Sequence, residues 1–189
     1  MKIDIIEESA VALSDYARIP ISYEVRSVFD VQNDSKGIHM TECPVGTPWF
    51  KDYDACNGEG PLRWADRWDI SNWGILSAFE NGVRLGGCAI AYQTLGLDLL
   101  EGKDDLAALW DIRVSPHGRG QGIGGCLLEA AIVWAKRHGC RQLKIETQNI
   151  NVPACRLYAK HGFTLDGINR HAYSDLPDEI QLVWCIDLL

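Results

Sequence analysis

The sequence lacks any run of about 18 or more apolar residues, the length that a membrane-spanning helix needs. Basic residues are also scarce, because 18 Lys and Arg stand against 26 Asp and Glu, for a formal net charge of −8. Binding to a phosphate backbone needs a basic face, so this balance argues against a nucleic-acid partner. It mildly favours a cationic ligand, although solubility alone is the stronger explanation of an acidic surface.

The first nine residues lack the basic and then apolar pattern of a signal peptide and carry Asp4, Glu7 and Glu8 instead, so we expect a cytoplasmic protein. No internal repeat or linker is visible, and 189 residues fit a single domain over 1–189. The cysteines are odd in number and lack metal-ligand spacing, so we expect buried free thiols and no metal. They are Cys43, Cys56, Cys88, Cys126, Cys140, Cys155 and Cys185.

The residue pattern predicts alternating strands and helices, with Asn81-Gly82 as a hairpin turn. Strands are predicted at 2–6, 22–31, 73–79, 83–93, 106–114, 141–147, 163–168 and 180–189. Helices are predicted at 11–18, 122–138 and 152–161. Residues 32–72 show no clean period, so we expect loops there with one helix near 60–68. The apolar side of the 122–138 helix is predicted to comprise Ile123, Leu127, Leu128, Ala131, Val133 and Trp134.

Glycines crowd the connection that follows the strand predicted at 106–114. Four of the seven positions from 118 to 124 are glycine, and a predicted helix begins there. The first turn of a helix has unpaired N–H groups and a partial positive charge, so this loop predicts an anion site. Glycines let a phosphate approach the backbone, and Arg119 adds a cation. A helix start that merely carries glycines is the alternative.

Two other phosphate-binding patterns fit less well. No Lys-Ser or Lys-Thr follows the glycines, which argues against a Walker loop, and residues 120–124 do not read G-x-G-x-x-G. Glu146 does stand at about the distance, roughly 20 residues, where a dinucleotide-binding domain has its ribose-binding acid. The segment 149–163, however, does not continue as such a domain.

Two segments together resemble the GNAT superfamily of N-acetyltransferases. Arg119, Gly122 and Gly124 have the spacing of its pyrophosphate signature. A second set of residues resembles the other signature of the superfamily. This set comprises Asn151, Ala154, Leu157, Tyr158, Lys160, Gly162 and Phe163. Within the superfamily the chain is most similar to streptothricin acetyltransferases, through residues 146–149, 151–152, 154–155, Tyr158 and 178–180, although Trp110 replaces one acid of an acidic pair in those proteins.

The resemblance implies an α/β (α+β) GNAT fold, with a central, mixed, mostly antiparallel, twisted sheet of six to seven strands. Helices flank this sheet, which is splayed between its fourth and fifth strands. The resemblance also implies acetyl-CoA as the acetyl donor, bound by a core at about 106–163, and an acceptor-site region within about 10–72. The cofactor-binding residues are then expected to be Ile112, Val114, Arg119, Gly120, Gln121, Gly122, Ile123, Gly124, Asn151, Ala154 and Tyr158. Asn151 could equally cap the 152–161 helix.

Acetyl transfer to an amine needs a base for the amine proton, a donor for the oxyanion and an acid for the leaving sulfur. Asp111 is the first candidate base, and alternation along 109–113 places it on the face opposite Trp110 and Ile112. A structural ion pair with Arg113 is the alternative role for Asp111. Glu146 is the other candidate base.

Tyr158 is the candidate acid, because a phenol can donate a proton while it stays neutral at pH 7. An aromatic residue packed in a helix core is the alternative. A backbone N–H near Ile112 is the expected oxyanion donor.

Tryptophans and acids in the 32–72 region could form a pocket for a cationic amine, and a solvated acidic loop packed by aromatics is the alternative. The selected substrate-binding residues are Trp64, Trp68, Asp66 and, on the 106–114 strand, Trp110. The wider set includes Trp49, Glu42, Asp52, Asp54, Glu59 and Asp69.

Three function classes follow from these expectations. The first is a small-molecule N-acetyltransferase that modifies the β-lysine amine of streptothricin and so gives antibiotic resistance. The second is an acetyltransferase of protein lysines or N-terminal amines, and the third is a non-catalytic acyl-CoA-binding module. Intact Arg119, Gly122, Gly124 and Tyr158 argue against the third. We expect a small-molecule amine partner, no nucleic acid and no membrane, and the resemblance allows a homodimer.

Overall fold

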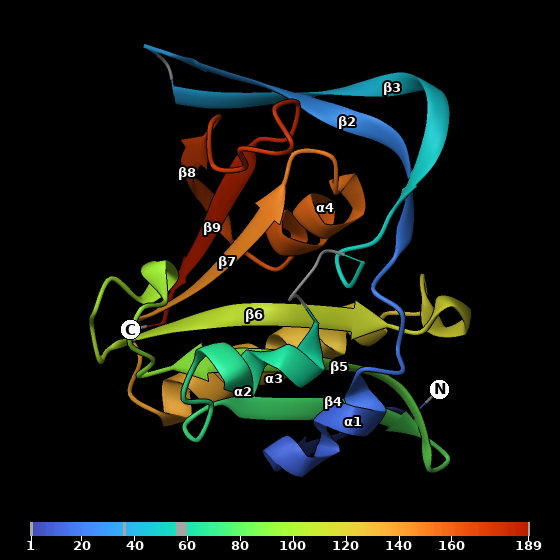
Figure 1. The fold of residues 1–189 in the computed structure, drawn as a ribbon, viewed down its shortest axis with the longest axis vertical. Coiled ribbons are helices and arrows are strands. Elements are labelled where there is room, and N and C mark those ends of the chain that lie inside the picture. The colour runs from blue at the N-terminus through green and yellow to red at the C-terminus, as the bar shows by residue number, and fades with distance from the viewer. Residues whose placement is uncertain (1, 36, 56–59, 189) are drawn as a thin grey trace. The chain divides into compact units, whose positions relative to one another are not determined.

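The computed structural model describes residues 2–35, 37–55 and 60–188 (Figure 1). The chain forms two compact units, which are Met1–Ser22 with Asp52–Lys144 and Asp187–Leu189, and Tyr23–Lys51 with Ile145–Ile186. Seven strands form one sheet in the order β1-β4-β5-β6-β7-β9-β8, which confirms the expected α/β sheet. Cys56 and Glu59, named above as a thiol and a pocket acid, lie outside the described residues.

Four antiparallel neighbours form the sheet of the first unit. They are β1 (Asp4–Glu8), β4 (Gly74–Glu80), β5 (Val83–Tyr92) and β6 (Leu106–Val114). The β4–β5 connection is the predicted hairpin turn, because Asn81 and Gly82 have φ values of 49° and 79°. Both residues therefore adopt the positive φ that a two-residue hairpin needs. The observed β6 has the predicted bounds.

Short helices cover one face of this sheet and one long helix covers the other (Figure 1). The first face carries η1 (Ala10–Ala12), α1 (Leu13–Tyr16), η2 (Pro61–Arg63) and α2 (Trp64–Arg67). The other carries α3 (Ile123–Arg137). Two adjacent glycines of β5 permit close packing on both faces. A Cβ atom on Gly87 would lie 2.6 Å from the Tyr16 ring, and one on Gly86 would lie 3.2 Å from Leu127.

The predicted helix ends are confirmed for α3. Gly122 is its N-cap residue, and Gly139, at φ 73°, follows its last turn. Five of the six residues predicted on its apolar side are buried or half-buried by their packing against the sheet, but Val133 is wrong, since it is 54% exposed. Two further 3-10 turns, η3 (Asp98–Leu100) and η4 (Pro116–Gly118), lie on either side of β6 in the chain.

The second unit contains α4 (Val152–Lys160), β8 (Thr164–Asn169) and most of β7 (Gln142–Gln148) and β9 (Gln181–Asp187). It also contains a separate two-stranded sheet of β2 (Tyr23–Asp34) and β3 (Gly37–Lys51). The prediction of loops over 37–51 is wrong. Most of β3 is exposed, and its half-buried positions change phase between Met40 and Cys43, so no single alternation runs along it; its pairing with β2 makes it a strand.

The thiols follow the expectation in part. Cys88, Cys140, Cys155 and Cys185 are buried thiols, whereas Cys43 is half-buried and Cys126 is exposed on α3. Burial raises the pKa of the Cys140 thiol to about 11 and that of Cys155 to about 12, so these thiols stay protonated at neutral pH. Among the described residues, no helix is long and apolar enough to cross a membrane.

Candidate active site

The glycine loop after β6 has the backbone that its sequence predicts. Gly120 and Gly122 have φ values of 75° and 86°, where residues with a side chain are strained. A Cβ atom at either position would meet no atom within 4 Å, so the loop surface there is open. The first α-helical hydrogen bond of α3 runs from the Cys126 N–H to the Gly122 carbonyl. The N–H groups of the helical residues before Cys126 therefore have no acceptor within the helix, and an anion site requires such N–H groups.

Arg119 is turned toward the backbone of its own unit. Its Nε donates to the Val114 carbonyl and its Nη2 donates to the Pro20 carbonyl, both at 3.0 Å. Partial burial lowers the pKa of the guanidinium, which remains far above neutral pH. Two of its donors thus tie the glycine loop to the end of β6 and to the segment after α1.

A β-bulge interrupts β6 at Trp110. Asp111 pairs with Ala89 and Leu109 pairs with Ile90, so Trp110 is an extra residue in the ladder. The bulge breaks the side-chain alternation, and the prediction that Asp111 lies on the face opposite Trp110 is wrong. Trp110 packs against the core cluster that contains Tyr16, and the Asp111 carboxylate accepts a hydrogen bond from the Tyr16 hydroxyl. Both side chains therefore lie on the face that carries α1 and α2.

Three donors point at the Asp111 carboxylate. Its Oδ1 accepts from the Tyr16 hydroxyl and from Arg113 Nε at 2.9 Å, and its Oδ2 accepts from Arg113 Nη2 at 2.6 Å. Burial and then the charge of Asp111 raise the pKa of Tyr16 well above its ordinary value, so its phenol stays protonated. Most of the accepting capacity of Asp111 is therefore already used.

Arg113 is fully buried beneath this network. Its Nη1 donates to Asp54 Oδ2 at 2.8 Å and to the Ile19 carbonyl at 3.0 Å, and its Nη2 donates to Asp54 Oδ1 at 3.2 Å. Burial acts to lower the pKa of Arg113, but the hydrogen bonds to Asp111 and Asp54 and the charge of Asp111 outweigh burial and raise it. The guanidinium lies 5.1 Å from the centre of the Tyr16 ring, a cation–π distance.

Four tryptophans form a cluster on the same face of the first unit. Trp68 meets Trp110 edge to face at 4.9 Å, and Trp73 lies 5.6 Å from Trp64, 6.1 Å from Trp110 and 6.2 Å from Trp68. These are the distances of favourable aromatic pairs. The cluster brings together Trp64, Trp68 and Trp110, which were predicted from the sequence as substrate-binding residues. It also places Trp64 against Tyr16 at 6.0 Å.

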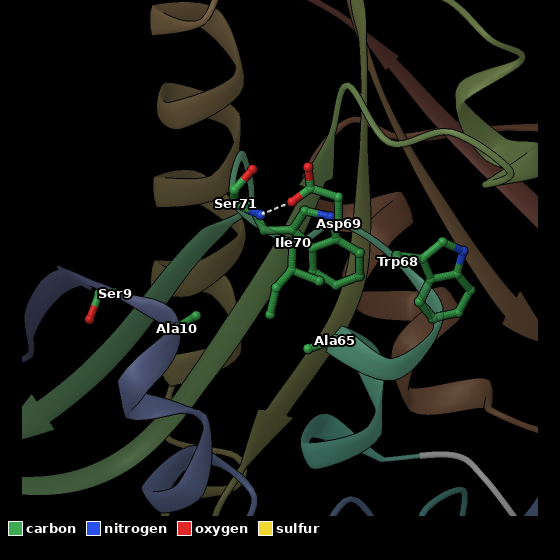
Figure 2. A pocket seen from close by; sticks show the side chains of 8 residues that line it. Ser9, Ala10, Ala65, Trp68, Asp69, Ile70 and Ser71 are labelled. Carbon is green, nitrogen blue, oxygen red and sulfur yellow. Dashed lines mark hydrogen bonds between the residues drawn. The ribbon is translucent and has the colours of Figure 1, made fainter.

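A pocket of about 480 Å³ opens beside this cluster (Figure 2). Its lining comprises Ser9, Ala10, Ala65, Trp68, Asp69, Ile70, Ser71 and Trp73. The Asp69 carboxylate is held by the Ser71 N–H at 3.0 Å, and this bond lowers its pKa, so the pocket rim is negatively charged at neutral pH. Of the selected acceptor residues only Trp68 lines this pocket. Asp66 pairs instead with Arg63 on the surface, at 3.1 Å.

The second unit carries the other candidate base on β7. Glu146 Oε1 accepts a hydrogen bond from the Tyr173 hydroxyl at 2.7 Å, and Gln148 Nε2 donates to that hydroxyl at 2.9 Å. Tyr173 belongs to the β8–β9 connection, which two hydrogen bonds between Asn149 and Ile180 attach to β7. A tyrosine that accepts one hydrogen bond and donates another is polarised toward its acceptor, here Glu146.

Tyr158 and Asn151 also lie in the second unit. Tyr158 is 3% exposed and packs 6.2 Å from both Phe163 and Trp184, so it contributes to the core of the unit. Asn151 is the N-cap of α4, and its side chain accepts a hydrogen bond from the Ala154 N–H at 3.3 Å. The capping role considered for Asn151 is confirmed, and it leaves the side-chain amide of Asn151 able to donate.

Several residues of these networks were not predicted from the sequence. Tyr16 and Tyr173 were not selected, and Arg113 was considered only as a partner of Asp111. One signal was available, because Asp111 and Arg113 are the only charged residues in the nine-residue strand β6. Two opposite charges at positions i and i+2 of a buried strand lie on one face and pair there.

Comparisons with known proteins agree with the glycine loop and the sheet. The model of the acetyltransferase (GNAT) family matches residues 44–163. A streptothricin acetyltransferase of Escherichia coli is 31% identical over 188 residues, which are 97% of this chain and 94% of that protein. Two solved structures show the same fold at a TM-score of 0.77.

One of these structures is nourseothricin acetyltransferase, which is 22% identical with full coverage of both chains. The other is a Bacillus anthracis (strain Ames) protein assigned as a streptothricin acetyltransferase and solved in complex with acetyl coenzyme A. It is 23% identical, and the match covers 98% of this chain and 99% of that one. Because the family model spans more than half of the chain and a relative above 30% identity spans nearly all of it, this protein belongs to the GNAT family of acetyltransferases.

Proposed function

We propose that this acetyltransferase moves the acetyl group of acetyl-CoA to an amine of a small cationic molecule, with the β-lysine amine of streptothricin as the acceptor. The observation that carries this proposal is the 31% identity to the Escherichia coli streptothricin acetyltransferase along nearly the whole of both chains. Acetylation removes a positive charge from the antibiotic, so the expected consequence is resistance of a cell that contains the enzyme in its cytoplasm.

The glycine loop fits the pyrophosphate of acetyl-CoA. The open surface at Gly120 and Gly122 supports this assignment, since no atom within 4 Å blocks the approach of a ligand. The N–H groups at the start of α3 supply donors and the positive end of the helix dipole. The main chain of Ile112 and Val114 would pair with the pantetheine arm, and Asn151 would donate to it.

Glu146 is the better candidate for the base. Asp111 already accepts from Tyr16 and twice from Arg113, whereas the one hydrogen bond found for Glu146 among the described residues comes from Tyr173. A carboxylate offers roughly four accepting sites. Glu146 therefore keeps more capacity to accept the amine proton, directly or through a water.

The remaining steps follow from the chemistry of amine acylation. The neutral amine attacks the thioester carbonyl, a carbon–nitrogen bond forms, and the carbon–sulfur bond breaks. A backbone N–H near Ile112 donates to the developing oxyanion. Tyr158 donates its phenolic proton to the departing sulfur. The proton that Glu146 took from the amine then returns to Tyr158 through solvent, so both side chains regain their starting protonation states.

Release of free thiol from acetyl-CoA tests the proposed function. With streptothricin present, we expect release at a kcat/KM above roughly 10⁴ M⁻¹s⁻¹, the lower end for real enzyme–substrate pairs. Calorimetry with acetyl-CoA alone measures cofactor binding separately. Cofactor binding without streptothricin-dependent release would contradict the acceptor, and the search would move to other amines, polyamines and protein lysines.

A further inference from the structure

We propose that Arg113 is a positioning residue for the acceptor. Its guanidinium holds two acceptor-side segments, defined as residues 16–20 and 52–55, against the strand β6. The inference rests on the proposed function in one respect, which is that the acceptor binds within residues 10–72. The positioning role of Arg113 is additional to the proposed function, because the match to the family assigns Arg113 no catalytic or binding role.

Arg113 uses all five of its N–H donors. Nε donates to Asp111, Nη1 donates to the Ile19 carbonyl and to Asp54, and Nη2 donates to Asp111 and to Asp54, at distances between 2.6 and 3.2 Å. An arginine has five such donors in one plane, whereas a lysine has three on one nitrogen. The site is therefore built for an arginine and joins three separate parts of the chain.

The burial of Arg113 shows that these bonds are needed. Its side chain has no exposed surface, and a buried cation is strongly destabilising unless it is paired and hydrogen-bonded. One carboxylate, Asp111, comes from β6 itself and is 8% exposed. The other, Asp54, is 29% exposed and comes from the connection before η2, so Arg113 fixes that connection.

A second arginine anchors the neighbouring carbonyl. Arg119 donates to Pro20, directly after the Ile19 carbonyl that Arg113 binds. Tyr16, at the end of α1, lies under the Arg113 guanidinium and donates to Asp111. Residues 16–20 are thus attached to β6 through Tyr16 and Ile19, and to the glycine loop after β6 through Pro20.

A lysine at position 113 keeps the charge but cannot reach all these acceptors. We expect Arg113→Lys to loosen both segments and to raise the acceptor KM, because misplaced positioning groups cost up to roughly 10²-fold. The expected rise is about tenfold or more, with kcat within about threefold and acetyl-CoA affinity within about twofold. The glycine loop keeps its own contacts, so cofactor binding should not change.

The matched control is Arg84→Lys. Arg84 also forms a two-point pair in the first unit, with Glu8 at 2.6 and 3.1 Å, and also bonds Ser77, but its partners lie outside the acceptor-side segments. Both variants should lower the unfolding temperature, and only Arg113→Lys should raise the acceptor KM. An equal KM in the two variants would show that Arg113 is purely structural.

A milder variant covers the case in which Arg113→Lys does not fold. Asp54→Asn leaves the pair between Arg113 and Asp111 intact, so we expect a folded protein with a raised acceptor KM. Asp105→Asn, which changes an exposed acid paired with Arg141 outside residues 10–72, is its control.

Amide hydrogen exchange provides a readout that does not depend on the acceptor. Relative to the wild type, Arg113→Lys or Asp54→Asn should exchange faster in residues 16–20 and 52–55, with residues 120–125 unchanged. Unchanged exchange in those segments would overturn the role of Arg113 whichever amine is the substrate. Absence of acceptor-dependent thiol release in the wild type would instead contradict the proposed function alone.

Discussion

Asp111 and Arg113 stand two residues apart on β6 and form a two-point ion pair, with Nε–Oδ1 at 2.9 Å and Nη2–Oδ2 at 2.6 Å. Arginine–carboxylate pairs of this kind are strong and directional. Because the pair occupies both carboxylate oxygens of Asp111, this residue is better suited to a structural role than to that of a general base. The role of base in the proposed mechanism then passes to Glu146, in the second unit.

The first prediction separates these two carboxylates. Glu146→Gln should lower kcat by about 100-fold, the lower end for the loss of a general base, with the unfolding temperature nearly unchanged. Asp111→Asn should mainly lower the stability, since it removes one of two carboxylates from the buried Arg113. Steady-state thiol release and thermal unfolding of both variants are the measurements. A larger loss of kcat in Asp111→Asn than in Glu146→Gln would restore Asp111 as the base.

The second prediction concerns the acid. Tyr158→Phe keeps the ring that packs against Phe163 and Trp184 but removes the hydroxyl, so the fold should hold. We expect kcat to fall by about 100-fold and acetyl-CoA affinity to stay nearly unchanged. Single-turnover thiol release and calorimetry check the two parts. Turnover equal to that of the wild type would remove Tyr158 from the mechanism.

The third prediction concerns the glycine loop. Gly122→Asp places a negative charge and a strained residue, at φ 86°, at the start of α3. Acetyl-CoA binding should weaken by at least about tenfold through repulsion of the pyrophosphate. Gly139→Asp is the matched control, because Gly139 has φ 73° and equal space but follows the other end of the same helix. Equal cofactor affinity in the two variants would contradict the assignment of the loop.

The fourth prediction concerns stability in acid. The hydrogen bond from Arg84 lowers the pKa of Glu8 below its ordinary value of 4.5. The carboxylate therefore contributes stability that is present above pH 4.5 and is lost as the pH falls through its lower value in the folded protein. Urea unfolding should show a steeper loss of stability below pH 4.5 in the wild type than in Glu8→Gln. Parallel curves would indicate that this pair contributes nothing to the acid sensitivity.

The sequence predicted most of the fold where local signals agree. Asn81-Gly82 marked a hairpin through its demand for positive φ, and Gly122 and Gly139 marked both ends of α3. The bounds of β6 followed from an apolar run that ends at Ser115-Pro116. These features depend on neighbouring residues and on backbone preference, which a sequence displays directly. β3 was missed because its alternation changes phase after Met40 and is interrupted by Gly and Pro, and long-range pairing with β2 decides its conformation.

The candidate site likewise has one part that the sequence predicts and another that depends on tertiary contacts. The backbone of the glycine loop at 118–124 and the helix start that follows it were predicted from the sequence alone, since both depend on local backbone preference. The side on which Asp111 lies was decided by the tertiary structure, because a bulge at Trp110 depends on the pairing of β6 with β5. Three of the five atoms that accept hydrogen bonds from Arg113 belong to Ile19 and Asp54, which lie 94 and 59 positions away in the chain. Sequence spacing cannot encode such contacts, because they form only when separate segments pack on one face of the sheet and exclude water from the charges between them.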